Sequence, residues 1–490
     1  MAHGRTIFSA GARAVGLAAI GTFILLFLAF EWLAVEPYGR YNVTYYEEQA
    51  NAFLAGQTYL LRAPPPALMA LPDPWDADTN ALFREPPDWD GPMFAGVVDL
   101  SLYHGKLYLE WGPVPSLLLI PIRWFTGPGV PMGHLALIVA TLSVLAYAYA
   151  TFLLARLCRI PVGGGIGALL FLHFLICPVW LFLLHRIRVY EVGICFGQLC
   201  MSLALLSTVI AFDRRLQGGK SALWLLAASS LLLGGLVNCR LGIAPFGLMV
   251  PVVWYCWLKI DATPIRSASA VRSAAALGLP AAGLLLGALV YNEVRFGSYL
   301  EIGQTWQLWG GHGSLWQGKF HFLALARFLP NIWYFFFAPV EFSASHSPLL
   351  AVPLHPPSSW MSPELLKAYD IYGERMSGLF VVMPVLTFLL LLPFGLLRAA
   401  AWRGAARARG VVALLLLCGV LSAFPLFLAP PVVRYGAEWC MWLLMAAILV
   451  IGRLRHLLRA RGWHAGAALL DGGIVLSTVW TAYAGVSFMI

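Results

Sequence analysis

The chain has 490 residues, of which 60% are hydrophobic and only 11% are charged, and its mean hydropathy is +0.77. This composition excludes a soluble globular protein, and repeated apolar runs of 18 or more residues are typical of membrane spans. The net charge of +9 does not indicate a nucleic-acid-binding protein, because the basic residues are scattered over short loops between the apolar runs.

The apolar runs predict an all-α polytopic membrane protein with about eleven transmembrane helices. The first run, 14–34, is interpreted as a retained signal anchor, because it is longer than the apolar part of a cleaved signal peptide. The runs 113–125 and 320–338 are expected to lie on the membrane surface. The chain is therefore divided into a cytoplasmic N-terminus with the first span (1–34), an outer loop with interface helices (35–133), a transmembrane bundle (134–291), a second outer loop (292–377) and C-terminal transmembrane helices (378–490).

Basic and acidic residues are unevenly distributed between the two sides of the predicted membrane. The segments expected inside the cell hold 18 Lys/Arg and 3 Asp/Glu, whereas the remaining segments hold 14 and 20. Basic residues favour the cytoplasmic side, so the N-terminus is predicted to be cytoplasmic. Arg outnumbers Lys 27 to 5, which favours a GC-rich bacterial genome and hence the bacterial inner membrane. The loop 36–112 carries 11 of the 23 acids, so the active face is expected to be periplasmic.

The first outer loop contains three predicted elements. Residues 41–56 read as a short amphipathic helix that stops at Gly56. The alternation of apolar and polar residues over 101–111 predicts a small hairpin around His104–Gly105. The Gly112-Pro-Val-Pro sequence then begins an apolar helix.

Two adjacent carboxylates, Glu47 and Glu48, follow the first span by one short loop. Paired carboxylates at a membrane surface can bind a cation, or one can act as a general base while the other orients the substrate. The alternative interpretation is a solvated helix face.

Several arginines are predicted at the same outer level as the acid-rich loop. The forked donors of arginine match phosphate oxygens, so a ligand that bears phosphate would suit them. Interfacial salt bridges explain the same pattern. The candidate residues for binding a substrate or donor phosphate are Arg188, Tyr190, Glu191, Arg240, Arg295, Arg434, Tyr435 and Glu438.

Neither cysteines nor histidines predict a metal site or a disulfide framework. The eight cysteines fall in or beside the predicted spans, and the outer histidines are not at metal-ligand spacing.

This layout resembles the GT-C superfamily of integral-membrane glycosyltransferases, which includes protein mannosyltransferases and aminoarabinose transferases of lipid A. The resemblance covers about the first 260 residues. YYEEQANAFLAG resembles the family's first-loop helix, and GKLYLEWGPVPSLLLIPIRWFTG resembles its Tyr, acid, Pro and apolar helix stretch. HRIRVYEVG places Glu191 at a position where many members carry Asp, and LLGGLVNCRLGIAPFGLMV places Arg240 at a basic position of the family.

The chain departs from the family pattern at the first acidic motif. Asn42-Val43 stands where the catalytic Asp-Glu pair usually occurs, and Glu47 and Glu48 follow more than one helical turn later. The candidates for the catalytic carboxylate are therefore Glu47, Glu48 and Asp99.

The resemblance implies transfer of a sugar from a polyprenyl-phosphate donor to a glycan, lipid or protein acceptor of the cell envelope, at the outer face and with inversion. A carboxylate would deprotonate the acceptor, and arginines or a divalent cation would hold the departing phosphate. Membrane lipids are the remaining expected partners. Two alternatives stay open: a transporter or flippase of a lipid-linked substrate, and a non-catalytic membrane scaffold of an envelope-synthesis complex.

Overall fold

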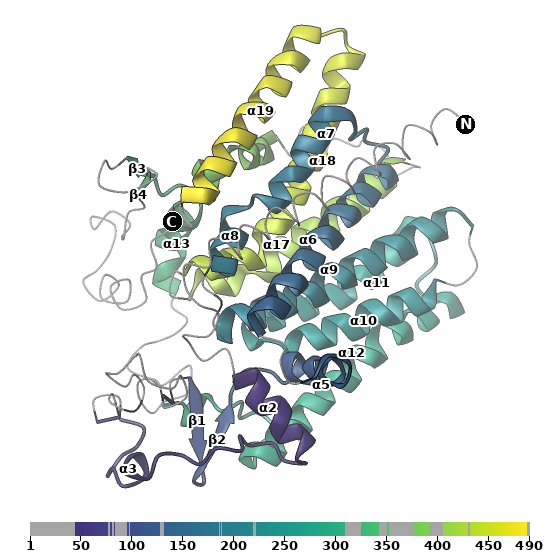
Figure 1. Cartoon of the computed structure of the whole chain (residues 1–490). Coiled ribbons are helices and arrows are strands. Elements are labelled where there is room, and N and C mark those ends of the chain that lie inside the picture. The colour runs from purple at the N-terminus through teal and green to yellow at the C-terminus, as the bar shows by residue number, and fades with distance from the viewer. Residues whose placement is uncertain are drawn as a thin grey trace.

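The computed structural model describes residues 45–76, 79–80, 83, 96–97, 99–127, 132–185, 187, 189–218, 222–308, 325–342, 350–351, 377–391, 405–429 and 432–487. The predicted first span, 14–34, and the candidate residue Arg188 lie outside the described residues. The described chain is mainly a bundle of helices with a smaller layer of short elements at one end (Figure 1).

Six helices among the described residues are long and apolar enough to cross a bilayer. They indicate a multi-pass membrane protein, while the total of about eleven spans stays a prediction. The six are α6 (Met132–Leu157), α7 (Gly164–Leu175) continued by α8 (Pro178–His185), α9 (Val189–Leu216), α12 (Ala268–Phe296), α18 (Cys440–Ala460) and α19 (His464–Ser487).

Shorter helices complete the bundle. The longest are α10 (Leu223–Val237), α11 (Met249–Ile260) and α17 (Ala405–Ser422). Helix α6 packs along α9, α10 packs on both α9 and α12, and α11 packs on α17. The remaining helical turns are α3 (Pro66–Met69), η1 (Leu241–Leu248), η2 (Gln304–Trp306), η3 (Leu325–Arg327), α13 (Phe328–Phe336), α15 (Leu379–Val382), η5 (Pro384–Leu391), η6 (Phe424–Phe427) and η7 (Val433–Glu438).

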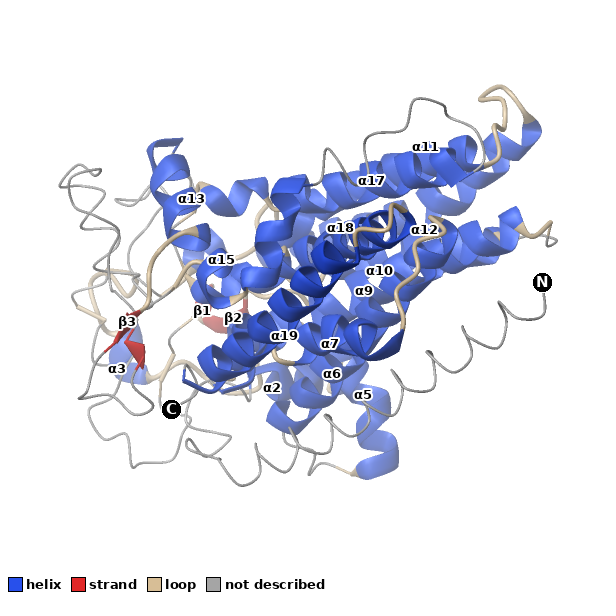
Figure 2. Ribbon diagram, turned by 90° about the horizontal axis from the view of Figure 1, so that it is seen from above, coloured by secondary structure: helices blue, strands red, loops and turns tan. Residues whose placement is uncertain are grey.

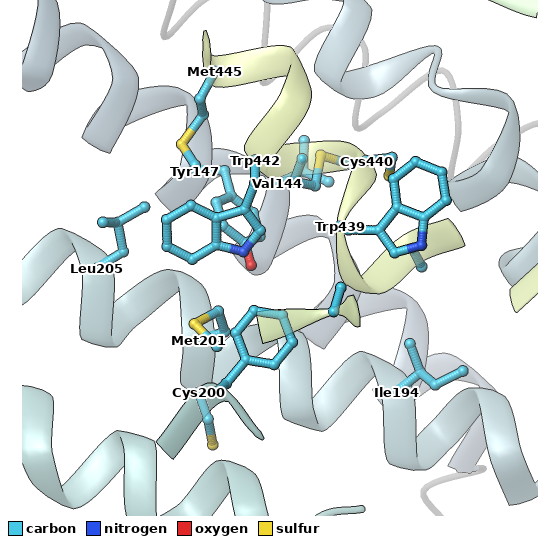
Figure 3. Packing of buried hydrophobic residues seen from close by; sticks show 14 of the residues in the cluster. Val144, Tyr147, Ile194, Cys200, Met201, Leu205, Trp439, Cys440, Trp442 and Met445 are labelled. Carbon is cyan, nitrogen blue, oxygen red and sulfur yellow. The ribbon is translucent and has the colours of Figure 1, made fainter. Parts of the chain in front are cut away.

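Large side chains from α6, α9 and α18 fill the centre of the bundle (Figure 3). Trp442 is fully buried, and the Tyr147 ring meets it edge-on with ring centroids 6.5 Å apart. The Tyr147 hydroxyl donates to Gln198 Oε1 at 2.6 Å. This bond satisfies both polar groups where water is absent, so the aromatic packing carries no desolvation cost at this point.

The layer at the end of the bundle contains α2 (Tyr45–Leu54), the hairpin of β1 (Leu100–Tyr103) and β2 (Lys106–Leu109), and α5 (Val114–Thr126) (Figures 1 and 2). The predicted hairpin is present, and Tyr103 pairs with Lys106. Its two-residue turn requires positive φ at both positions, and His104 (47°) and Gly105 (71°) adopt it. A second small hairpin joins β3 (Glu341–Phe342) to β4 (Leu350–Ala351).

The α5 helix follows the hairpin directly. Pro113 and Pro115 lie at its start, where a missing backbone N–H costs nothing. It has 13 residues, which is too short to cross a bilayer, and Trp124 and Phe125 at its end are 74% and 91% exposed. These features are typical of a helix that lies on a membrane surface.

Candidate active site

The register of the β1–β2 hairpin brings two carboxylates together. Leu100 pairs with Leu109, so Asp99 and Glu110 flank the open end of the hairpin opposite each other. Asp99 is 3% exposed, and its backbone φ of 61° lies in the left-handed region. Residues other than glycine adopt this region infrequently, and such conformations concentrate at functional sites.

Glu110 lies in an environment that disfavours its charge. Its Oε2 atom is buried and has no hydrogen-bond partner among the described residues. Burial raises the pKa of Glu110 well above its usual value, the nearby charge of Asp99 raises it further, and Arg295 opposes the shift. Both burial and the neighbouring Asp99 carboxylate therefore disfavour the charged form of Glu110.

Tyr190 connects Asp99 to the transmembrane helices. It is the second residue of α9, and its hydroxyl donates a hydrogen bond to the Asp99 carboxylate. The Trp111 ring meets the Tyr190 ring edge-on with centroids 5.1 Å apart. On the same ring, the Arg434 guanidinium carbon lies 4.5 Å from the centroid. Tyr190 therefore orients the carboxylate and also places a cation near it.

Two arginines meet at Glu438, the last residue of η7. Arg240 Nη1 lies 3.0 Å from Glu438 Oε1, and these residues are 5% and 1% exposed. Burial raises the pKa of Glu438 to about 7, and both Arg240 and Arg434 oppose the shift. Arg434 also lies 3.8 Å from Glu191, and Arg240 lies over the Tyr435 ring at 4.9 Å. The buried Arg240 and the partly buried Arg434 thus share one region with the Asp99 carboxylate.

Gly112 lies very close to the turn after α10, and this contact holds the hairpin layer against the helix bundle. Val114 N–H donates to Asn238 O at 3.3 Å, and a Cβ atom at residue 112 would lie 1.8 Å from the same oxygen. Only glycine fits, because the obstacle is backbone that cannot rotate away. The approach places Trp111 beside Arg240, with the guanidinium carbon 5.9 Å from the ring centroid.

Gly112→Ala is expected to destabilise the fold by about 3 kcal/mol, the upper end of the usual cost of overpacking. Thermal unfolding in detergent measures the loss. Gly472→Ala is the matched control, since a Cβ atom there would meet nothing within 4 Å. Equal stability of the two variants would show that the Gly112 contact does not hold the layer to the bundle.

The carboxylates of α2 lie apart from this cluster. Glu47 pairs with Arg123 at 3.0 Å, and Glu48 pairs with Arg62 at 3.1 Å. Burial raises the pKa of both carboxylates, and the paired arginine opposes each shift. The pairs tie α2 to α5 and to the following loop. Of the three predicted catalytic carboxylates, only Asp99 lies in the region of Arg240 and Arg434.

The four predicted arginines do not form one group. Arg240 and Arg434 meet at Glu438, whereas Arg295 lies by the hairpin. Arg295 donates to Leu109 O at 2.9 Å and to Asn292 Oδ1 at 2.8 Å, which anchors the end of α12 to β2. Arg188 lies outside the described residues.

Three residues of the cluster were not among the sequence candidates: Tyr46, Glu110 and Trp111. The Tyr46 hydroxyl is buried close to Arg240 and Glu110, and no side chain or backbone group in the described part of the chain forms a hydrogen bond with it. Glu110 could have been found from the predicted hairpin, because a two-residue turn at 104–105 places residue 110 opposite residue 99. No local pattern distinguishes Tyr46 from its neighbour Tyr45.

Within the described ranges, no group of three or more His, Cys, Asp and Glu side chains is arranged to hold a metal ion. Asp99 can accept a proton, and Arg240 and Arg434 can stabilise an anion in a region of low dielectric.

No protein-family model matches the chain. No curated protein matches it either. Among solved structures, the chain is similar to the crystal structure of the Archaeoglobus fulgidus oligosaccharyltransferase tethered to an acceptor peptide that contains the NVT sequon, with a TM-score of 0.41 and 13% sequence identity. The match covers 80% of this chain and 49% of that chain, so this chain spans about half the length of the protein it matches.

Proposed function

We propose that this protein is a membrane glycosyltransferase that moves a sugar from a polyprenyl-phosphate donor to an envelope acceptor at the outer face of the membrane. One observation carries the proposal: Asp99 lies with Tyr190, the buried Arg240 and the partly buried Arg434 where the hairpin of the first loop meets the ends of the membrane helices. A base beside an anion site is what transfer from a phosphate leaving group needs.

Asp99 is the proposed base. The acceptor hydroxyl oxygen attacks the anomeric carbon of the donor sugar, and its proton passes to the Asp99 carboxylate. The Tyr190 hydroxyl holds the carboxylate in position through its hydrogen bond. Burial and the nearby charge of Asp99 raise the pKa of Glu110, which disfavours its ionised form, so Asp99 rather than Glu110 is proposed as the base.

Arg240 and Arg434 are proposed to hold the donor phosphate. As the bond between the anomeric carbon and the phosphate oxygen breaks, its electron pair stays on that oxygen, and the arginines stabilise the added negative charge. Glu438 and Glu191 hold the guanidinium groups in place before the donor binds, at 3.0 and 3.8 Å. An arginine that is already oriented loses less conformational entropy when the phosphate arrives.

Binding of a polyprenyl phosphate to the purified protein tests the phosphate site. Native mass spectrometry of the detergent-solubilised protein is expected to show one bound polyprenyl phosphate, and Arg434→Gln to weaken the binding about tenfold, the loss of one charge-assisted hydrogen bond. Arg123→Gln is the matched control, because Arg123 pairs with Glu47 away from the cluster. Equal binding by the two variants would place the phosphate elsewhere, and no binding by the wild type would contradict the donor class.

A further inference from the structure

The opposite end of the bundle, where the α6–α7, α11–α12 and α18–α19 connections lie, has a second concentration of arginines (Figure 1). The sequence segments expected on this side hold 18 basic residues and three acidic residues. Each of the three acids already has an arginine partner. The pairs are Arg156 with Asp213, Arg215 with Asp261, and Arg455 with Asp471.

Arg409 and Arg453 differ from these paired arginines. Neither has an ion pair or a hydrogen bond within the part of the chain that the structure describes. Both side chains are half-buried, Arg409 on α17 and Arg453 on α18. The two charges are close enough to repel each other. Because the described residues offer these two half-buried cations no acid, a bound anion would offset their charge.

The helices that carry the two arginines come close to the α6–α7 connection, 158–162. Arg409 is close enough to act on the Cys158 thiol through its charge. Arg453 follows Gly452, where a Cβ atom would lie 2.8 Å from Val162 and 2.9 Å from Ile160. The same connection carries Arg159, which is exposed and has a left-handed backbone with φ of 54°. Arg159, Arg409 and Arg453 therefore all lie in or near one short connection at the end of the spans.

We infer that Arg409, Arg453 and the 158–162 connection bind the phosphate of an anionic phospholipid in the leaflet on this side of the membrane. The position favours a lipid over free phosphate, because the ends of spanning helices lie at the level of the lipid phosphates, and a lipid remains there at high local concentration. This inference does not depend on the proposed transfer reaction.

Lipid-dependent stability of the full-length protein tests the inference. Phosphatidylglycerol added to the detergent-solubilised protein is expected to raise its melting temperature above that in phosphatidylcholine. In the Arg409→Gln/Arg453→Gln variant the phosphatidylglycerol concentration needed for half the effect should increase about 30-fold, since each cation near an anionic lipid contributes a factor of about five. Arg461→Gln, which removes an exposed arginine at the same end, should keep the wild-type response.

A charge reversal separates a lipid site from a structural role. Arg409→Glu would pair with Arg453, so the variant should be at least as stable as the wild type in phosphatidylcholine and should gain little from phosphatidylglycerol. The inference is overturned if the Arg461→Gln and double variants lose the response equally, since that indicates diffuse surface charge. It is also overturned if the double variant responds like the wild type, or if inorganic phosphate at the same concentration stabilises the wild type as well as the lipid does.

Discussion

Replacement of Asp99 by asparagine is expected to lower the rate of glycosyl transfer by about three orders of magnitude, within the usual contribution of a general base. Asparagine keeps the size of the side chain and can accept the hydrogen bond from Tyr190, but it cannot take the acceptor proton. The measurement is release of polyprenyl phosphate from a panel of polyprenyl-phosphate sugars in membranes that contain the native acceptors.

Two matched variants control this result. Glu47→Gln and Glu48→Gln make the same chemical change in carboxylates that pair with Arg123 and Arg62, so each should retain most of the transfer activity. If a Glu47 or Glu48 variant is inactive while Asp99→Asn is fully active, the base is a residue of α2 and not Asp99. If all three variants stay fully active, none of these carboxylates is the base; a wild type without any transfer activity would instead favour the scaffold alternative.

The second large expected effect is a loss of stability when the buried Arg240–Glu438 pair is broken. Arg240→Gln or Glu438→Gln alone should destabilise the protein by about 3–5 kcal/mol, because each leaves a charge buried at 1–5% exposure without its partner. The double variant Arg240→Met/Glu438→Leu should recover most of this stability, since two apolar side chains of similar volume need no partner. Unfolding in detergent at pH 8 measures all three variants.

The same double variant distinguishes a functional pair from a structural one. If the pair holds the donor phosphate, the stable apolar variant should still lose polyprenyl-phosphate binding by tenfold or more, because it lacks one of the two cations. Recovery of both stability and binding would show that Arg240 only fills the interior. Additive destabilisation in the double variant would show that the pair is not coupled.

Parts of the site follow from local sequence alone. The alternation over 101–111 and the turn residues His104–Gly105 determine the hairpin, because the strand period and the positive φ of the turn are local properties. The register then places Asp99 opposite Glu110. The prolines at 113 and 115 determine where α5 begins, since their missing N–H groups suit only a first turn.

The sequence also predicts that this is a multi-pass membrane protein. The insertion of apolar runs into a bilayer and the preference of basic loops for one side of it both depend on local composition rather than on tertiary contacts. Six of the predicted spans have counterparts among the described helices. Glu47 and Glu48 are candidates in the sequence because they are adjacent carboxylates in the first loop. In the structure they form ion pairs with Arg123 and Arg62, and their catalytic role stays a prediction.

Only the tertiary structure decided which charges meet. Arg240, Arg434 and Glu438 come from segments about 200 residues apart, and each has equally plausible local partners in the sequence. Gly112 docks against the backbone of Asn238, two residues before Arg240, and this contact between two segments is likewise not evident from the sequence of either. Local sequence determines helices, turns and membrane affinity through short-range backbone preferences, whereas the partner of a buried charge depends on packing between distant segments.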